Sequence, residues 1–301
     1  AVELSVAQDK GNIVFLTQKE WVYYPETGTE PAAGNYADSM YVADLRNAGY
    51  NVTVPNYEDY KTLGPEQLSV LNFADLVILG RGVSSGDFND DDDYLWAELR
   101  TPILLMSNFT ARGKRLSWIR TNSQVNIEKI DTCFAKVEVP DDPVFAGLEI
   151  PADNIIPYTE GVVYPVNAHK DSVGINGDVI LSLAGIGTAY DIDLDVGMYR
   201  DTLDMAEFED LILMARWMPG DSMYTGKIDD YVAAVPAGHR SYITVGGETF
   251  DYDATRQARK YYALTDVMNQ VFLNEVERLL LLPVHTPLEK QKIMFITHND
   301  W

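Results

Sequence analysis

The chain has 301 residues, of which 46% are hydrophobic and 23% are charged, as is typical of a globular protein with its own core. Its 46 acidic residues outnumber its 23 basic residues, which gives a net charge of −23. This charge repels phosphate backbones and anionic lipids, so it argues against nucleic-acid binding and membrane binding. No apolar run reaches the roughly 18 residues of a membrane span, and the single cysteine, Cys133, rules out an intrachain disulfide.

Apolar runs alternate with helical patterns in the first part of the chain. Four buried strands are predicted, at Ile13–Thr17, Tyr50–Val54, Ala74–Gly80 and Pro102–Met106. Three helices are predicted between them, at Tyr36–Ala48, Leu63–Asn72 and Asp90–Leu99. Gly49 follows the first helix, Pro65 opens the second, and the third has an acidic first turn. This alternation predicts an α/β fold with a mainly parallel sheet and helices on both of its faces.

The second half of the chain is less regular. Further strands are predicted at Val137–Val139, Gly161–Pro165, Val179–Ala184, Leu211–Trp217 and Arg240–Val245. A long terminal helix is predicted over Ala254–Leu282, before Pro283. We therefore expect one domain over residues 1–283, with insertions in its second half.

Five segments carry a family resemblance: Gly49–Val54, Ala74–Gly86, Pro102–Ser107, Asp141–Leu148 and Ala237–Gly247. With the order of the elements, they resemble the class I glutamine amidotransferase-like (flavodoxin-like) superfamily. More narrowly, the chain is similar to uncharacterised amidotransferase-like domains of bacterial secreted proteins. The resemblance implies a three-layer sandwich with a flavodoxin-like sheet, and an extracellular or cell-surface location.

The resemblance does not extend to the glutaminase nucleophile. In catalytic relatives a cysteine lies on a tight elbow after the strand that matches Pro102–Met106, within the pattern G-x-C-x-G. The matching residue here is Ser107, and its flanking residues are Leu105 and Phe109. Because such an elbow is strained and needs small neighbours, these two side chains would crowd it. The relatives' histidine follows a later strand, whereas His239 precedes Arg240–Val245. Ser107 is therefore a weak catalytic candidate, and we expect it to be a polar residue that ends a strand.

Two acidic stretches alternate oxygen ligands in a way that Ca²⁺ could use. They contain Asp87, Asn89, Asp91 and Asp93, and Asp191, Asp193 and Asp195. On an extended strand, alternate side chains point the same way, so the second stretch would gather three carboxylates. These repel one another unless a cation such as Ca²⁺, or alternatively Arg200, neutralises them. The other interpretation of the first stretch is an acidic helix start beside a solvated loop.

Polar and aromatic residues follow the first, third and fourth strands, where open α/β sheets bind ligands. The candidate ligand-binding residues are Trp21, Arg81, Ser84, Ser85 and Asn108. Some aromatic rings could stack on a glycan, or alternatively simply cover the sheet: Trp21, Tyr23, Tyr24, Trp96, Trp118 and Tyr224. Arg81 could anchor an anion or pair with the acidic stretch that follows it.

The two ends of the chain share a pattern. Residues 13–21, IVFLTQKEW, are echoed by residues 293–301, IMFITHNDW, which lie 280 residues later (293 − 13). Residues 284–301 are therefore interpreted as a linker plus a strand that begins a further repeat or adds to a neighbouring copy.

These observations favour a non-catalytic binding or structural module of a secreted multidomain or self-assembling protein. Its expected partners are neighbouring domains or other copies of the chain, with a glycan as a candidate ligand. The alternative is a hydrolase or carbohydrate-active enzyme that uses the loops after the first, third and fourth strands.

Overall fold

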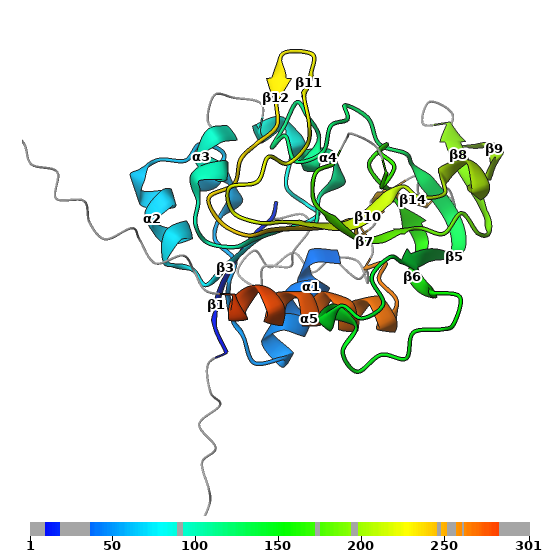
Figure 1. Cartoon of the computed structure of the whole chain (residues 1–301), viewed down its shortest axis with the longest axis horizontal. Coiled ribbons are helices and arrows are strands. Elements are labelled where there is room, and N and C mark those ends of the chain that lie inside the picture. The colour runs from blue at the N-terminus through cyan, green and yellow to red at the C-terminus, as the bar shows by residue number, and fades with distance from the viewer. Residues whose placement is uncertain are drawn as a thin grey trace, which may run out of the picture.

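The computed structural model describes residues 10–18, 37–88, 93–171, 175–193, 198–245, 248–251, 257–260 and 262–282. In these parts of the chain, eleven strands form one sheet in the order β2-β1-β3-β4-β13-β10-β7-β5-β8-β9, with β6 also paired to β5 (Figure 1). Two short hairpins stand apart from this sheet. They are β11 (Lys227–Ile228) with β12 (Tyr231–Val232), and β14 (Glu248–Asp251) with β15 (Gln257–Lys260).

One half of the sheet is parallel. It consists of β2 (Asn51–Thr53), β1 (Asn12–Leu16), β3 (Leu76–Leu79), β4 (Ile103–Leu105) and β13 (Arg240–Ile243). All four neighbouring pairs in this order run parallel. This is the flavodoxin-like strand order, and it confirms the predicted α/β fold class.

The other half of the sheet is antiparallel. It contains β10 (Ile212–Trp217), β7 (Asp178–Leu183), β5 (Ile127–Val137), β6 (Ile155–Val163), β8 (Thr188–Asp193) and β9 (Met198–Asp204). The direction changes where β10 pairs antiparallel with β13. The insertions expected in the second half thus extend the same sheet.

Helices cover both faces of the parallel half, as predicted. They are α1 (Ala37–Asn47), α2 (Pro65–Phe73), α3 (Asp93–Glu98), α4 (Asn108–Ala111) and α5 (Asp266–Leu281). Helices α1 and α5 lie on the same side of the sheet (Figure 1) and share one apolar core with Ile13 and Phe15. Helices α2 and α3 share the other core with Val14 and Leu16. Alternate residues of β1 therefore face opposite layers, as the pleat requires.

The predicted terminal helix began too early. The helix starts at Asp266, and Thr265 caps it because its Oγ1 accepts a hydrogen bond of 3.3 Å from the Met268 amide. Residues 257–260, which the prediction placed in the helix, form β15 instead. Short 3-10 turns, which the apolar pattern did not indicate, occupy Tyr57–Tyr60, Ser85–Phe88, Pro143–Phe145 and Met205–Phe208.

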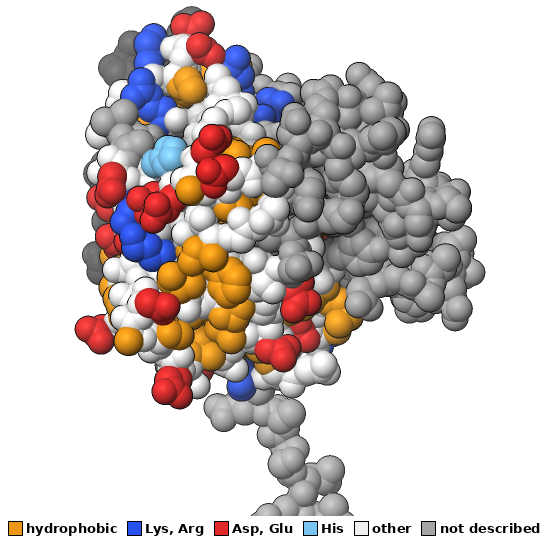
Figure 2. All heavy atoms as spheres, turned by 90° about the vertical axis from the view of Figure 1, so that its right-hand side faces the viewer, with side chains coloured by type: hydrophobic (Ala, Val, Ile, Leu, Met, Phe, Trp, Pro, Cys, Tyr) orange, Lys and Arg blue, Asp and Glu red, His pale blue; other side chains and the backbone are white. Residues whose placement is uncertain are grey.

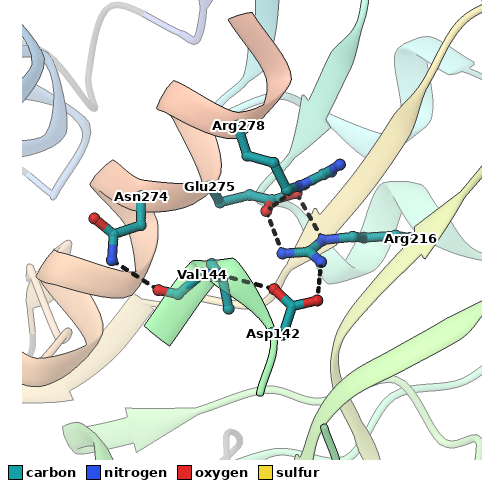
Figure 3. A network of polar contacts seen from close by, with 6 residues as sticks. All are labelled: Asp142, Val144, Arg216, Asn274, Glu275 and Arg278. Carbon is teal, nitrogen blue, oxygen red and sulfur yellow. Dashed lines mark hydrogen bonds and ion pairs between the residues drawn. The ribbon is translucent and has the colours of Figure 1, made fainter. Parts of the chain in front are cut away.

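An ion-pair network fastens α5 to the antiparallel half (Figure 3). The guanidinium of Arg216, on β10, donates from Nε to Oε1 of Glu275 at 3.1 Å and from Nη2 to Oε2 at 2.5 Å. Its Nη1 donates to Oδ2 of Asp142 at 2.6 Å, and Arg278 donates to both oxygens of Glu275. Burial lowers the pKa of Arg216, but its two acidic partners more than compensate, so the net shift is upward. The fully buried carboxylate of Glu275 is thus matched by two guanidinium groups.

None of the described helices combines the length and the apolar character needed to cross a membrane.

Candidate functional site

The strand order places a topological switch point beside β1. Because β2 and β3 pair with opposite sides of β1, the connections that follow β1 and β3 run to opposite sides of it, and open α/β sheets usually bind ligands at the carboxyl ends of strands at such a point. Thr17 follows β1 here, and Gly80, Arg81 and Gly82 follow β3. Helix α1 begins at the same edge, with Asp38 in its first turn. This edge is therefore the candidate site.

Asp38 is the centre of the site. Its side chain is fully buried, and its Oδ2 accepts hydrogen bonds from Thr17 Oγ1 at 2.5 Å and from the Gly82 amide at 2.9 Å. Its Oδ1 has no hydrogen-bond partner among the described residues. Burial raises the pKa of Asp38 to about 6, against the opposing effects of the Thr17 hydroxyl, the backbone amides of Gly82 and Arg81, and the charge of Arg81. Asp38 is therefore a buried carboxyl group with one oxygen still able to accept a hydrogen bond.

Gly80 makes room for this carboxyl group. A Cβ atom at this position would lie 2.6 Å from Asp38 Oδ2 and 2.6 Å from Cε1 of Phe15. A side chain would therefore displace either the carboxylate or the buried ring. Glycine is therefore required directly after β3, because a side chain at this position would clash with the site.

Arg81 lies over aromatic rings. The centre of its guanidinium is 4.7 Å from the centroid of the Phe109 ring and 5.9 Å from that of the Tyr164 ring. These two rings meet edge to face, with centroids 6.2 Å apart. In the acidic stretch after β3, Asp87 is 3.9 Å from Lys61. Arg81 is thus held between the edge of the sheet and an aromatic pair.

Ser107 ends β4 and precedes α4. Its backbone is extended, with φ −99° and ψ 110°, and its Oγ accepts a hydrogen bond of 3.0 Å from Thr110 Oγ1. The backbone carbonyl of His239 accepts from the Ile103 amide at the start of β4. His239 therefore lies at the amino end of these parallel strands, whereas Ser107 lies at their carboxyl end. This geometry is that of a strand-ending residue with a bonded hydroxyl.

Asn108 lies next to Ser107 and is also fully buried. Neither its Oδ1 nor its Nδ2 has a hydrogen-bond partner among the described residues. Asn108 and Asp38 flank the end of β3, because the Met106 amide donates to Leu79 and the Gly80 amide donates to Leu16. Two buried groups with unmet hydrogen-bonding capacity therefore lie on either side of one strand end.

Of the remaining ligand-binding candidates, two lie in the loop after β3 and one lies outside the described residues. Ser84 and Ser85 are half-buried in the loop after β3, and the carbonyl of Ser84 accepts from the hydroxyl of Tyr57. Trp21, Tyr23 and Tyr24 lie outside the described residues. The other rings considered for glycan stacking are buried in the core that α2 and α3 share: Trp96, Trp118 and Tyr224. They cover the sheet, as the alternative interpretation held.

The two proposed calcium stretches stay predictions. Asn89, Asp91 and Asp195 lie outside the described residues. Asp191 and Asp193 alternate along β8, Asp87 lies in the 3-10 turn Ser85–Phe88, and Asp93 starts α3. Among the described residues, no group of three or more His, Cys, Asp or Glu could hold a metal ion.

The sequence prediction missed Asp38 and Thr17. A signal was present: an acidic residue in the first turn of the helix that follows the first strand, at the edge where the Gly-Arg-Gly sequence ends the third strand. Asp38 is 21 residues from Thr17 and 44 residues from Gly82, so only the strand order brings the three together.

A comparison with protein-family models finds no match, and neither does a comparison with curated proteins. Several solved structures are similar in fold. A cytoplasmic protein of Salmonella typhimurium is 10% identical, with a TM-score of 0.48 over 89% of this chain and 99% of that chain. A ThuA-like protein of Parabacteroides merdae is 11% identical, with a TM-score of 0.45 over 93% and 92% of the two chains.

A glutamine amidotransferase of Thermotoga maritima is 9% identical, with a TM-score of 0.29 over 57% of this chain and 66% of that chain. At these identities the similarity concerns the fold alone.

Proposed function

We propose that this chain is a non-catalytic binding module that holds a small polar ligand at the carboxyl ends of β1, β3 and β4. The observation that carries this proposal is Asn108, a fully buried amide whose oxygen and nitrogen both lack partners among the described residues. A buried polar group left without a partner costs roughly 1–3 kcal/mol. A ligand that pairs with the amide would recover this cost when it binds.

The geometry of Ser107 argues against glutaminase chemistry. A nucleophile needs a base within hydrogen-bond reach and, in this superfamily, a strained elbow. Ser107 has extended backbone, its hydroxyl is bonded to Thr110, and Phe109 supports Arg81. Phe109, which departs from the glutaminase pattern, thus has a structural role, because its ring packs against Arg81.

The ligand class follows from the buried groups that have no hydrogen-bond partner among the described residues. Asp38 Oδ1 can accept a hydrogen bond, and the Asn108 amide can both accept and donate. A hydroxyl-rich molecule such as a sugar offers both functions on adjacent carbons. We therefore propose a neutral saccharide as the ligand.

A carbohydrate-active enzyme is the second candidate. Asp38 favours it, because a carboxyl group whose pKa is raised to about 6 can act as a proton donor near neutral pH. Glycoside hydrolysis would also need a second carboxylate across the bound sugar. Release of reducing sugar by the wild type, lost in Asp38→Asn, would favour this candidate over pure binding.

The test of the binding module is a thermal-shift series with neutral mono- and disaccharides. The wild type should gain melting temperature with at least one sugar, whereas Asn108→Leu should not respond. Without sugar, Asn108→Leu should be about 1–2 kcal/mol more stable, because leucine matches the shape of the amide and needs no partner. Asn47→Leu, at an exposed position on α1, is the matched control and should keep the sugar response. A loss of stability in Asn108→Leu, or no response of the wild type to any sugar, would count against the proposal.

The repeated terminal pattern supports a place in a larger assembly. In β1, Ile13 and Phe15 pack in the core beneath α1, and Thr17 donates to Asp38. The same three residue types recur at Ile293, Phe295 and Thr297, which lie outside the described residues. We propose that this segment is the first strand of a further, similar domain. A natural polypeptide continuing the repeat would then carry an aspartate 21 residues after Thr297, as Asp38 follows Thr17.

A further inference from the structure

Three features that favour an anion converge at the switch point between β1 and β3. The hydroxyl of Thr17 and the amide of Gly82 both donate toward one position. Helix α1, of eleven residues, begins at the same edge, and its amino end carries a partial positive charge. Switch points of this kind bind phosphates and other anions through such donors.

In this chain the position is already filled. Oδ2 of Asp38 accepts both hydrogen bonds, at 2.5 Å from Thr17 and 2.9 Å from Gly82. Little room is left beside this oxygen, since even a Cβ at Gly80 would lie 2.6 Å from it and 2.6 Å from Cε1 of Phe15. A phosphate could reach these donors only by displacing the carboxylate.

We propose that Asp38 is a built-in substitute for a bound anion, so that the site rejects phosphate-bearing ligands and accepts a hydrogen-bond donor at Asp38 Oδ1. Oδ1 is fully buried and has no partner among the described residues, so it is the part of the carboxylate left for a ligand. The choice of ligand rests on the proposed function, whereas the filled anion position does not.

Removing the carboxylate should uncover the anion site. In Asp38→Ala, the Thr17 hydroxyl and the Gly82 amide lose their common acceptor, and the space left matches the carboxylate of formate. Arg81 contributes a positive charge that favours the carboxylate form at this position. The variant should therefore bind formate where the wild type does not.

The experiment measures melting temperature in sodium formate against sodium chloride of equal ionic strength. Asp38→Ala should gain a saturable stabilisation of a few °C in formate, of the order expected when a ligand is far above its Kd. The wild type and Asp38→Asn, in which the position stays filled, should show no difference between the two salts. Asp38→Ser is measured in parallel, with formate present during purification, as a second variant that leaves the position open.

The outcomes separate the two proposals. If neither open variant is stabilised or recovered by formate, or if Asp38→Asn responds equally, the anion-site inference is overturned. If the open variants respond to formate while the wild type binds no sugar, the anion site stands and the binding function fails. The ligand selectivity itself is tested by comparing glucose with glucose 6-phosphate on the wild type, which should respond only to a neutral sugar.

Discussion

At the scale of single residues, burying the charged form of Asp38 is the largest electrostatic cost in the site. A carboxyl group with an ordinary pKa of 3.8 that rises to about 6 on folding binds protons more tightly in the native state. Between these two values the folded protein holds more protons than the unfolded chain, so this group's contribution to stability falls as pH rises. The full difference is about 3 kcal/mol, present as a cost above pH 6.

This sign gives a direct prediction for Asp38→Asn. The free energy of unfolding of the wild type minus that of the variant should decline from pH 4 to pH 7, because only the wild type must bury a charge. Urea unfolding at several pH values measures this difference, in which the other carboxyl groups cancel. A difference that stays flat, or rises with pH, would show that Asp38 is not buried as a costly anion.

Gly80 offers a second prediction at this scale. Gly80→Ala should destabilise the protein by roughly 1–3 kcal/mol, because the new methyl group would press on Asp38 and on the Phe15 ring. Gly86→Ala is the control, since a Cβ there meets only the Ser84 hydroxyl, at 3.5 Å. Chemical denaturation should separate the two variants clearly; equal stability would contradict the tight packing around the carboxylate.

At the scale of elements, helix α5 is held by a buried charge network more than by its cap. Glu275 is fully buried and bonded to Arg216 and Arg278, and Asn274 on the same helix donates to the carbonyl of Val144 (Figure 3). Asn274 also donates to the carbonyl of Ala146. Asp142 ties the turn before Val144 to the same guanidinium. The network thus joins α5, β10 and the Pro143–Phe145 turn into one unit.

Glu275→Gln should therefore be strongly destabilising. Replacing the carboxylate removes one of the two charges that balance a mostly buried Arg216 and the partner of Arg278, and breaking a buried pair costs up to about 3–5 kcal/mol. Glu277→Gln, exposed on the same helix, should change the free energy of unfolding by less than about 0.5 kcal/mol. Similar urea midpoints for the two variants would mean that the network contributes little.

At the scale of the whole molecule, the net charge of −23 means that acidic side chains repel one another. Figure 2 shows one face on which acidic side chains are scattered, with basic ones among them, around a central hydrophobic area. Such self-repulsion should weaken as salt screens it.

Melting temperature should therefore rise from low salt to about 0.15 M NaCl, where the screening length shortens to about 8 Å.

Calcium gives a second comparison: if the acidic stretches bind Ca²⁺, 1 mM CaCl₂ should raise the melting temperature more than 1 mM MgCl₂ does. Equal effects of the two cations would leave only screening and contradict the calcium prediction.

The parallel half of the fold could be predicted because its information is local. Continuous apolar runs separated by amphipathic stretches are what strands buried on both faces, and the helices that cover them, require. Strand direction in the second half could not be predicted, because an apolar run such as Ile212–Trp217 reads the same in either orientation. The start of α5 was also missed, because the residues Gln257–Lys260, which form β15, have a composition that is equally typical of a helix turn.

By itself, the sequence determined the α/β class, the buried parallel strands and the lack of small residues around Ser107. Only the tertiary structure revealed Asp38 as the centre of the site. The reason is physical: the carboxylate accepts hydrogen bonds from Thr17 and Gly82, which are remote in the chain. They are brought to it because β3 pairs beside β1 in the sheet, on the side opposite β2. Burial is likewise a property of the packed molecule: it raises the pKa of Asp38, and it leaves the Asn108 amide without a hydrogen-bond partner among the described residues.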